Sequence, residues 1–392
     1  MILNYYNDLL YQPSELFLSK DFGQVATVLG RLHGSSVQHL ICCNTVNESL
    51  STFAGNNVFQ AKKSLRFLPS KVDFLKNIRG YLFLWRHRKK FSILVMLPFT
   101  PLSDLLMVRT FLALNPNAKI IIKLDANVDH LERLQQAYKS TRIGFWRQHV
   151  SYRELLVRAT TVIYETRNVG RLLKEKNFLE LNSPQKFVNV YNGVSEQQMS
   201  DTAPPRKHSS ERNNVIIFSG RLSAPQKNVE LIFKSDPVPP GWKIRFLGKV
   251  DETFRRVIEE YKQNDSRFDE KYEFLGELAD KGEYYKAFSA GKILLLCSNW
   301  EGFPMVYSEA HYFGLYIVTT SVSGADEATD GGRLGTVVPP NDPGALKAAL
   351  LSVCTHTDID AAIALARGYG QQHFVWERSL RTPRVDSVFE KS

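Results

Sequence analysis

The sequence has few cysteines and no long apolar run, and each absence narrows the class of protein. Neither metal-ligand spacing nor the density of a disulfide framework is found among its four cysteines, Cys42, Cys43, Cys297 and Cys354. The most apolar run, residues 91–99, is about nine residues long, against the roughly 20 that a membrane-spanning helix needs. The first residues carry no basic segment ahead of an apolar core, so we expect no secretory signal. Together these features favour a reducing, cytoplasmic location.

Two motifs that would indicate other functions are also missing. No Gly-x-Gly-x-x-Gly run follows an early strand, which argues against a nicotinamide dehydrogenase. His130, His149 and His311 are isolated and lack zinc spacing. Nothing in the sequence requires a metal or a resident cofactor.

Positive charge is concentrated in the first half of the chain. Residues 1–193 hold 26 Lys and Arg against 13 Asp and Glu, a balance of +13, and the remainder holds 24 against 27, or −3. Ten of the cations lie between Lys62 and Lys90, interleaved with aromatic side chains. Such a stretch is typical of a protein that rests on an anionic membrane surface. A solvated helix with one core face is the alternative; a nucleic-acid stripe would be expected to bring a recognised motif, and none is present.

The second half alternates short apolar runs with amphipathic stretches. This pattern predicts a parallel sheet covered by helices on both faces. The expected strands are residues 215–219, 243–247, 272–275, 292–298 and 316–320, and the expected helices are residues 228–234, 252–263, 281–290 and 305–313. The first half is less regular, with expected strands at residues 91–97, 119–124, 161–164 and 187–191.

A polar, proline-containing segment divides the chain. Residues 195–213 are the one stretch with the composition of a linker. We therefore expect an α/β protein with two doubly wound domains: residues 1–194, a linker at 195–213, residues 214–370, and a final helix at 371–392. Two such domains would leave a cleft between them.

Three polar clusters follow expected strands of the second half, where ligands bind in open α/β sheets. One begins with Gly220 and Arg221, and Lys227 follows one loop later. Glycine lets backbone approach a ligand, arginine grips phosphate as a fork, and lysine adds a point charge. Two cations at this spacing suit a diphosphate, although a surface pair that caps a helix is the alternative for these residues taken alone.

The second cluster is a strand-to-helix turn that carries two carboxylates. It runs from Glu301 through Gly302, Phe303, Pro304 and Met305 to Glu309. Gly302 permits a tight turn, and Pro304 suits the first helical position. The helix N–H groups that follow suit phosphate or sugar oxygens, and Glu309 suits vicinal hydroxyls. A capped helix with a solvated Glu309 is the alternative.

With its cation pair and its glutamate pair, the second half resembles the donor site of retaining GT-B glycosyltransferases of glycosyltransferase family 4. Smaller matches agree, namely the runs 191–194, 323–327, 335–343 and 374–377. The resemblance is specific over about residues 188–380 and only topological before that. It implies the GT-B fold, with two Rossmann-like domains whose sheets face a central cleft. It also implies a nucleotide-sugar donor, UDP- or GDP-linked, and a metal-independent transfer that retains anomeric configuration.

The resemblance also implies a role for each of these residues. Gly220, Arg221 and Lys227 would bind the donor diphosphate, Glu309 the ribose, and Glu301 would lie beside the donor sugar. Main-chain amides of the turn, at Gly302, Phe303, Pro304 and Met305, would contact sugar and phosphate. The final helix would cross back onto the first domain.

The first half departs from the family pattern on the acceptor side. The usual early Gly-Gly turn is replaced by a loop that contains Lys20 and Gly23, and Asp125 stands at a strand end where a histidine is common. We expect Lys20, Gly23 and Asp125 to face the acceptor, with Asp125 as a catalytic candidate; a helix cap is the alternative for Asp125.

The predicted function is transfer of a sugar from a nucleotide donor to a hydroxyl of a glycan or lipid-linked acceptor. Bacterial surface polysaccharide synthesis, such as lipopolysaccharide, O-antigen or capsule, is the process implied by the resemblance. The enzyme would be cytoplasmic and peripheral on the inner face of the membrane. Alternatives are a nucleotide-sugar epimerase on the same plan and a non-catalytic module that binds sugar or a membrane.

Overall fold

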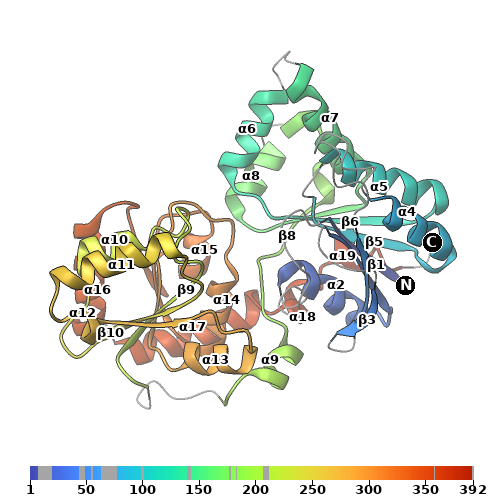
Figure 1. Cartoon of the computed structure of the whole chain (residues 1–392). Helices are drawn as coiled ribbons and strands as arrows, with labels where there is room; N and C mark the ends of the chain where they lie inside the picture. Colours follow the sequence, from blue (N-terminus) through green and yellow to red (C-terminus); the bar gives the residue numbers. More distant parts are fainter. Residues whose placement is uncertain are drawn as a thin grey trace. The chain divides into compact units, whose positions relative to one another are not determined.

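The structure is a computed structural model that describes residues 1–7, 20–43, 49–53, 56–62, 77–98, 101–138, 143–175, 178–181, 183–205, 212–356 and 358–390 (Figure 1). The chain forms two compact units. The first contains Met1–Val190 together with Leu380–Ser392, and the second contains Tyr191–Ser379. About half of the stretch from Lys62 to Lys90, residues 63–76, lies outside the described residues.

The first unit is built around an eight-stranded sheet in the order β3-β4-β2-β1-β5-β6-β7-β8. All neighbours pair in parallel except β3 and β4, which are antiparallel. Its strands are β1 (Ile2–Asn7), β2 (Val37–Cys43), β3 (Ser49–Phe53), β4 (Asn56–Lys62), β5 (Ile93–Met96), β6 (Lys119–Leu124), β7 (Thr161–Tyr164) and β8 (Phe187–Asn189). Its helices are α2 (Asp21–Leu32), α4 (Ile78–His87), α5 (Pro101–Leu114), α6 (Val128–Tyr138), α7 (Ile143–Arg158), α8 (Arg167–Glu175) and α19 (Pro383–Asp386), with 3-10 turns η2 (Arg88–Lys90), η3 (Phe178–Glu180) and η4 (Pro184–Lys186).

The second unit has a six-stranded parallel sheet in the order β11-β10-β9-β12-β13-β14. Its strands are β9 (Val215–Ser219), β10 (Lys243–Leu247), β11 (Tyr272–Gly276), β12 (Ile293–Leu296), β13 (Tyr316–Thr320) and β14 (Gly335–Val338). Its helices are α9 (Glu196–Thr202), α10 (Glu230–Ser235), α11 (Glu252–Asn264), α12 (Phe268–Lys271), α13 (Lys281–Ser289), α14 (Met305–Phe313), α15 (Ala325–Thr329), α16 (Pro343–His356), α17 (Ile359–His373) and α18 (Trp376–Ser379).

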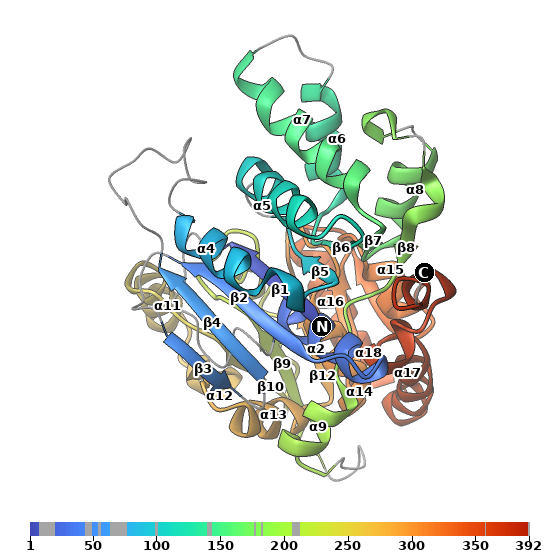
Figure 2. The same cartoon turned by 90° about the vertical axis from the view of Figure 1, so that its right-hand side faces the viewer.

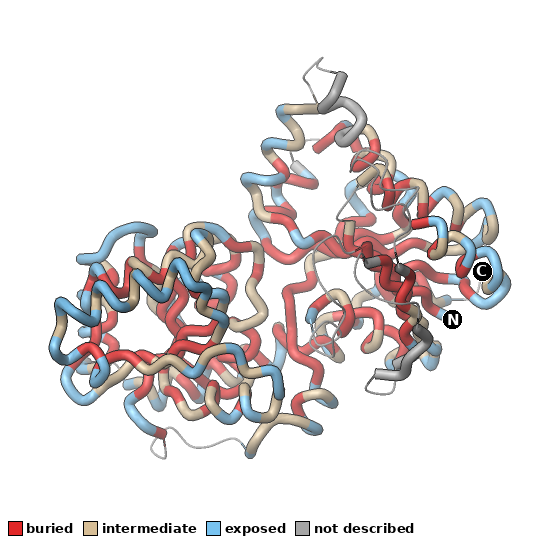
Figure 3. The backbone as a smooth tube through the Cα atoms, viewed as in Figure 1, coloured by how far each residue is buried: buried red, intermediate tan, exposed pale blue. Residues whose placement is uncertain are grey.

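The strands at the centre of both sheets are buried on both faces. In β9, β12 and β13 every residue is buried, and Figure 3 shows the buried colour concentrated in the interior of each unit. A strand that is buried on both faces carries apolar side chains on both, so its sequence is a continuous apolar run. The apolar runs that predicted a parallel sheet therefore correspond to strands buried in this way. The predicted bounds of β9, β10 and β13 are confirmed.

Four strands of the first unit differ from the sequence-based expectation. The strands β1, β2 and β4 were not expected, and β3 breaks the parallel order at one edge of the sheet. The reason is visible in β1 and β2: buried Asn4 places its amide nitrogen 3.0 Å from Nδ1 of His39, also buried. Polar side chains that satisfy one another inside the sheet hide the apolar pattern of these strands.

The expected linker begins with a helix. Ser195 caps α9, because its Oγ accepts a hydrogen bond from the Gln198 amide at 3.4 Å. Met199 of this helix is buried, and the Ser195 hydroxyl also donates to Glu377 at 2.8 Å. The linker expectation is therefore corrected over residues 196–202, which form α9 within the second unit.

The last residues of the chain pack on the first unit. Lys119 donates to the Ser387 carbonyl at 3.2 Å, and Arg384 donates to the Thr160 carbonyl at 2.6 Å. The rings of His33 and Phe389 stack with their centroids 3.8 Å apart. The chain thus starts and ends in one unit.

The described helices differ from membrane-spanning ones in length or composition. None of them, taken singly, has both the length and the apolar composition to cross a bilayer. One pair, α16 with α17, passes by length and composition together, but it is bent by 102°.

A close backbone approach fixes the loop after β9. Gly220 donates to the Leu247 carbonyl at 2.9 Å, and Gly248, at φ +153°, donates to the Gly276 carbonyl at 2.8 Å. A Cβ on Gly248 would lie 1.8 Å from the Gly220 carbonyl oxygen. The two strand ends therefore approach as closely as glycine allows.

We predict that Gly248→Ala destabilises the protein by about 3 kcal/mol, because the added methyl group overlaps backbone that cannot yield. Gly241→Ala is the control, since Gly241 also has positive φ, +78°, but its Cβ would meet nothing within 4 Å. That control should lose about 1 kcal/mol. Urea unfolding followed by circular dichroism measures both, and equal losses would contradict the packing argument.

Candidate functional site

The candidate site lies at the carboxyl edge of the sheet in the second unit. The strands β9, β12 and β13 are neighbours, and they run in parallel. The polar clusters that follow them therefore meet at one edge. This edge holds Gly220 and Arg221 after β9, Glu301 after β12, and residues 321–327 after β13.

Lys227 and Glu301 form an ion pair at this edge. The ammonium nitrogen Nζ lies 2.7 Å from Oε1 of Glu301, and the two side chains are 13% and 7% exposed. Ser298 donates to the same oxygen at 2.7 Å, and Gln226 donates to Oε2 at 3.0 Å. The predicted cation and the predicted acid are thus brought into direct contact across 74 residues of sequence.

The backbone around Lys227 is held by buried polar contacts. The Cys297 thiol donates to the carbonyls of Lys227 and Asn228 at 3.2 and 3.3 Å. Burial raises the pKa of this thiol to about 12, so it stays protonated and acts as a donor. The Asn299 amide donates to the Gln226 carbonyl at 2.8 Å. The loop after β9 is thereby pinned to the end of β12.

Arg221 differs from Lys227 in its surroundings. It is exposed, and it makes no ion pair with any described residue. Its neighbour Gly220 lies against the aliphatic part of Lys227: a Cβ there would be 3.0 Å from Lys227 Cε. Both cations therefore flank one short stretch of backbone, with Arg221 open to solvent.

Glu309 is the most buried of the four charged residues. Its side chain is 5% exposed, the Tyr284 hydroxyl donates to Oε2 at 2.8 Å, and Lys281 Nζ lies 4.0 Å from Oε1. Burial raises the pKa of Glu309, and the Lys281 charge and the Tyr284 hydrogen bond act in the opposite direction. The Tyr284 hydroxyl also lies 2.9 Å from Ser219 Oγ. Tyr284 therefore joins Glu309 to the end of β9.

The turn between β12 and α14 has the predicted form with one correction. Pro304 is the N-cap, with φ −66° and ψ 136°, and Met305 is the first helical residue. Proline stands one position earlier than expected because its backbone is extended, as a cap requires. Phe303 is buried, and Gly302 is half-buried. The helix ends at Phe313, as predicted, and Gly314 after it has a left-handed φ of +69°.

The smaller motifs meet at the same turn. Asn192 donates to the Phe303 carbonyl at 2.7 Å, and a Cβ on Gly324 would lie 2.9 Å from the Gly302 carbonyl oxygen. Asn228, next to Lys227, donates to Asn341 at 3.0 Å. Segments from five places in the sequence thus build one scaffold around the ion pair.

The acceptor-side residues lie in the first unit, where the expected loop around Lys20 and Gly23 is corrected to a helix start. Helix α2 begins at Asp21, so Gly23 is in its first turn and not in a loop. The Gly23 amide donates to the Lys20 carbonyl at 3.1 Å, and Lys20 is an exposed N-cap residue without a side-chain cap bond. Asp125 follows β6 and is exposed.

A buried charge cluster, not anticipated from the sequence, lies next to Asp125. Lys123, at 2% exposure, bonds Asp21 at 2.6 Å and also contacts Glu165. Burial raises the pKa of Glu165 to about 8; Lys123 opposes this shift, and Asp125 and Asp21 reinforce it. The pKa of Lys123 is raised despite burial, because both carboxylates favour its charged form. Two acids share one cation here.

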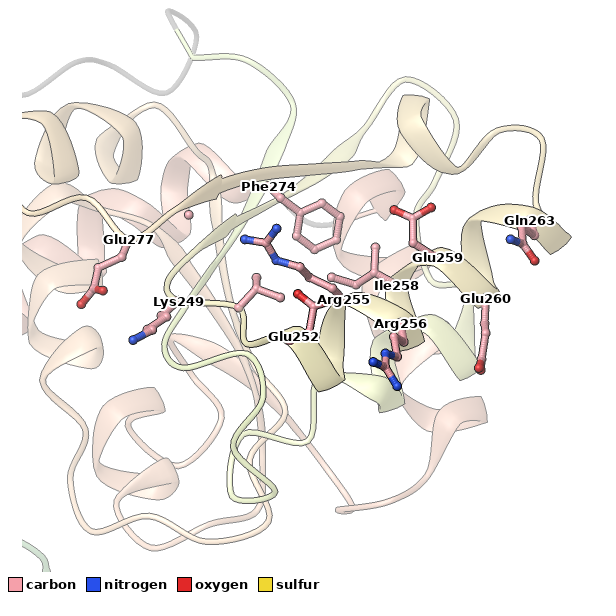
Figure 4. Close-up of a pocket in the computed structure, with 12 residues that line it drawn as sticks. Lys249, Glu252, Arg255, Arg256, Ile258, Glu259, Glu260, Gln263, Phe274 and Glu277 are labelled. Atoms are coloured by element: carbon pink, nitrogen blue, oxygen red, sulfur yellow. The ribbon is translucent and has the colours of Figure 1, made fainter.

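A separate cavity of about 880 Å³ lies between α11 and β11. Figure 4 shows Phe274 on its strand side and Arg255, Arg256 and Glu260 on its helix side. It adjoins the loop after β9, where the Leu222 amide donates to the Lys249 carbonyl at 3.1 Å and the Asp251 amide donates to Ser223 Oγ at 3.0 Å. None of the predicted donor residues lines it. Within the described residues, no group of three or more His, Cys, Asp or Glu could hold a metal.

Comparison with known proteins identifies the class of fold first. The sucrose-phosphate synthase of Thermosynechococcus elongatus aligns over 93% of this chain and 91% of its own, with a TM-score of 0.70 and 17% identity. Anabaena HepE, solved with UDP-glucose, aligns over 99% and 97%, with a TM-score of 0.67 and 15% identity. The chain has the two Rossmann-like units of the GT-B fold.

The family match follows from the sequence of the second unit. Residues 213–356 match the family model of glycosyl transferases group 1. The match confirms the resemblance to glycosyltransferases over this stretch. WcaL of Salmonella typhimurium, named as a candidate colanic acid biosynthesis glycosyltransferase, is 29% identical over 147 residues, which is 36% of this chain and 35% of WcaL. The chain thus matches about a third of that relative's length.

Several residues that shape the site escaped prediction. Tyr284, Ser298, Gln226 and Cys297 carry no recognisable motif, and their contacts are visible only once β9, β12, α13 and α14 are assembled. Ser298 and Gln226 did stand next to predicted residues. The one sequence feature that could have indicated Ser298 and Gln226 is the position of their polar side chains at the end of a strand or loop.

Glu165 gives a pH-dependent prediction. Its pKa of about 8 in the folded chain is above the roughly 4.3 of an exposed glutamate, so the folded state binds more protons between these values. The stability that Glu165 contributes is therefore complete below about pH 4 and is lost as the pH rises toward 8. We predict that Glu165→Gln flattens the fall in unfolding free energy from pH 5 to about pH 8.

Urea unfolding across this pH range measures the effect. Glu154→Gln is the matched control, because Glu154 is held by Arg109 and Arg158, which lower its pKa. Glu154 therefore titrates below the pH range of the measurement, which runs from pH 5 to about pH 8. A pH profile of Glu165→Gln parallel to that of the unchanged protein would contradict the assignment.

Proposed function

We propose that the chain is a retaining, metal-independent glycosyltransferase that moves a sugar from a nucleotide sugar to a hydroxyl of a glycan or lipid-linked acceptor. The observation that carries the proposal is the contact between Lys227 and Glu301, with Arg221 and Glu309 on the same sheet edge. Two cations and two carboxylates there match the two parts of a nucleotide-sugar donor, its diphosphate and its hydroxyl-bearing rings.

The cations would act on the leaving group. As the bond between sugar and phosphate breaks, negative charge grows on the diphosphate, and fixed positive charges lower the energy of that state. Arg221, exposed and without an ion pair among the described residues, can bind phosphate oxygens as a fork. Because a nucleoside diphosphate is a weak base, it needs no proton donor to leave.

Donor binding would change the hydrogen-bond partners of Glu301. Lys227 and Ser298 both bond Oε1 of Glu301, and Gln226 bonds Oε2. A bound diphosphate would compete for the Lys227 ammonium and leave Glu301 held by the two neutral donors. The released carboxylate oxygen could then accept a hydrogen bond from a hydroxyl of the donor sugar. Donor binding and orientation of Glu301 are coupled in this way.

Glu309 would bind the ribose. Its Oε2 is occupied by the Tyr284 hydroxyl, and its Oε1 has Lys281 at 4.0 Å. A carboxylate has about four lone-pair directions, so both oxygens can still accept bonds from vicinal hydroxyls. Tyr284 also contacts Ser219, directly before Gly220. It would therefore set the spacing between the ribose and diphosphate sites.

Retention is proposed for the reaction because the donor residues resemble those of retaining enzymes. An oxocarbenium-like centre would form as the diphosphate leaves, and the acceptor hydroxyl would attack from the same face. A phosphate oxygen would take the acceptor's proton. Asp125 remains the acceptor-facing candidate of the first unit.

UDP-sugars are the first donors to test, because the Anabaena structure contains UDP-glucose, and GDP-sugars are the second. We propose surface polysaccharide synthesis as the process, supported by the colanic acid role in the name of the Salmonella relative. The acceptor would lie at an anionic membrane on its cytoplasmic face, in keeping with the +13 charge balance of the first half.

Activity is tested by nucleotide release from a panel of nucleotide sugars with a cell-envelope acceptor extract. We predict that Glu301→Gln and Arg221→Ala each lower release by about 100-fold or more, because each removes charge that acts on the donor. Glu283→Gln and Arg255→Ala, both at exposed positions of the same unit, should retain the full rate.

Release at the full rate in the Glu301 and Arg221 variants would contradict the assignment of these residues. Conversion of the donor to an isomer without acceptor would instead indicate an epimerase. Binding of nucleotide without turnover, for every donor and acceptor offered, would indicate a non-catalytic module.

A further inference from the structure

Helix α4 exposes an apolar stripe. Ile78, Leu82 and Trp85 are 50%, 52% and 55% exposed. Their spacing of four and three residues puts them on one face of the helix. Among the described residues, these are three of the nine exposed large apolar side chains, and no other helix has three.

The opposite face of α4 is fixed in the core. Phe83 and Leu84 are buried, and the Phe83 ring stacks on Phe59 at a centroid distance of 4.4 Å. Gly80 lets the helix approach the sheet so closely that a Cβ there would lie 2.8 Å from Cys42 Sγ. Figure 2 shows α4 lying across the strands of the first sheet. The helix cannot roll to bury its apolar stripe without losing this packing.

Positive charge surrounds the stripe. Arg79, Arg86, Arg88, Lys89 and Lys90 lie within or directly after α4, and residues 77–92 contain no Asp or Glu. The Arg88 guanidinium lies 5.1 Å from the centre of the Trp85 ring, and it donates to the Trp85 carbonyl at 2.8 Å. The cationic and aromatic groups therefore occupy the same end of the surface.

We propose that α4 and η2 form the surface by which the protein docks on an anionic lipid bilayer. Ile78, Leu82 and Trp85 would enter the boundary between headgroups and acyl chains, while the five cations reach lipid phosphates. Long arginine and lysine side chains suit this position, since their stems are apolar and their ends are charged. This inference names the surface behind the proposed membrane location, and it rests on the proposed function only for the nature of the acceptor.

Co-sedimentation of the full chain with vesicles tests the proposal. The vesicles are phosphatidylcholine alone, or phosphatidylcholine with about one quarter phosphatidylglycerol. We expect binding to the anionic vesicles that falls as salt is raised, because counter-ions screen the cations. The double variant Leu82→Ser with Trp85→Ser should lower the partition coefficient by about tenfold or more. Arg86→Glu with Lys89→Glu should abolish the preference for anionic vesicles.

Matched controls lie on the second unit. Leu365→Ser removes an equally exposed leucine, at 55%, and Arg255→Glu with Arg256→Glu reverses two exposed cations. Both should bind vesicles as the unchanged protein does, and melting temperatures establish that every variant is folded. Absence of vesicle binding, or binding that the α4 variants leave unchanged, would overturn the proposal. Equal binding to neutral vesicles would overturn it too.

The outcomes separate this inference from the transfer reaction. Nucleotide release with a soluble acceptor should be the same in the α4 variants and the unchanged protein. Nucleotide release at the full rate without vesicle binding would contradict the docking surface but not the transfer reaction. The apolar stripe of α4 would then be a contact surface for a protein partner. Vesicle binding through α4 without release would contradict the proposed function alone.

Discussion

The ion pair between Lys227 and Glu301 is the contact on which the account of the second unit depends. Both charges are largely removed from water, which costs free energy that the pair alone does not always recover. Here Ser298 and Gln226 satisfy further lone pairs of the carboxylate, and the Cys297 thiol fixes the lysine backbone. The pair therefore holds together the loops that follow β9 and β12. These two strands are neighbours in the sheet but lie far apart in the chain.

A pair of this kind suits a site that must exchange one partner for another. Glu301 neutralises Lys227, and in the proposed function a diphosphate would offer the lysine a stronger anionic partner. In the proposed exchange, Ser298 and Gln226 would still hold Glu301 in position, and its free carboxylate oxygen would face the sugar. Binding energy from the phosphates would in this way be used to orient the group beside the reacting centre.

Much of the second unit could be predicted from its sequence, since its buried parallel strands are continuous apolar runs. The cation pair and the glutamate pair were predicted as one site because strand ends meet at one edge. The first unit was harder: Asn4 and His39 satisfy each other inside the sheet and disguise β1 and β2. Lys123 looks like a surface residue of β6, and only the fold reveals the two carboxylates that let it be buried. Tyr284 contacts Glu309 and Ser219 through tertiary packing, which no local pattern encodes.

The most direct measurement is a crystal structure of the protein bound to UDP or to a UDP-sugar. The account predicts the diphosphate between Arg221 and Lys227, the ribose hydroxyls on Glu309, and Glu301 parted from the lysine ammonium. A nucleotide bound elsewhere, for example in the cavity beside α11, with the Lys227–Glu301 pair still closed, would contradict it.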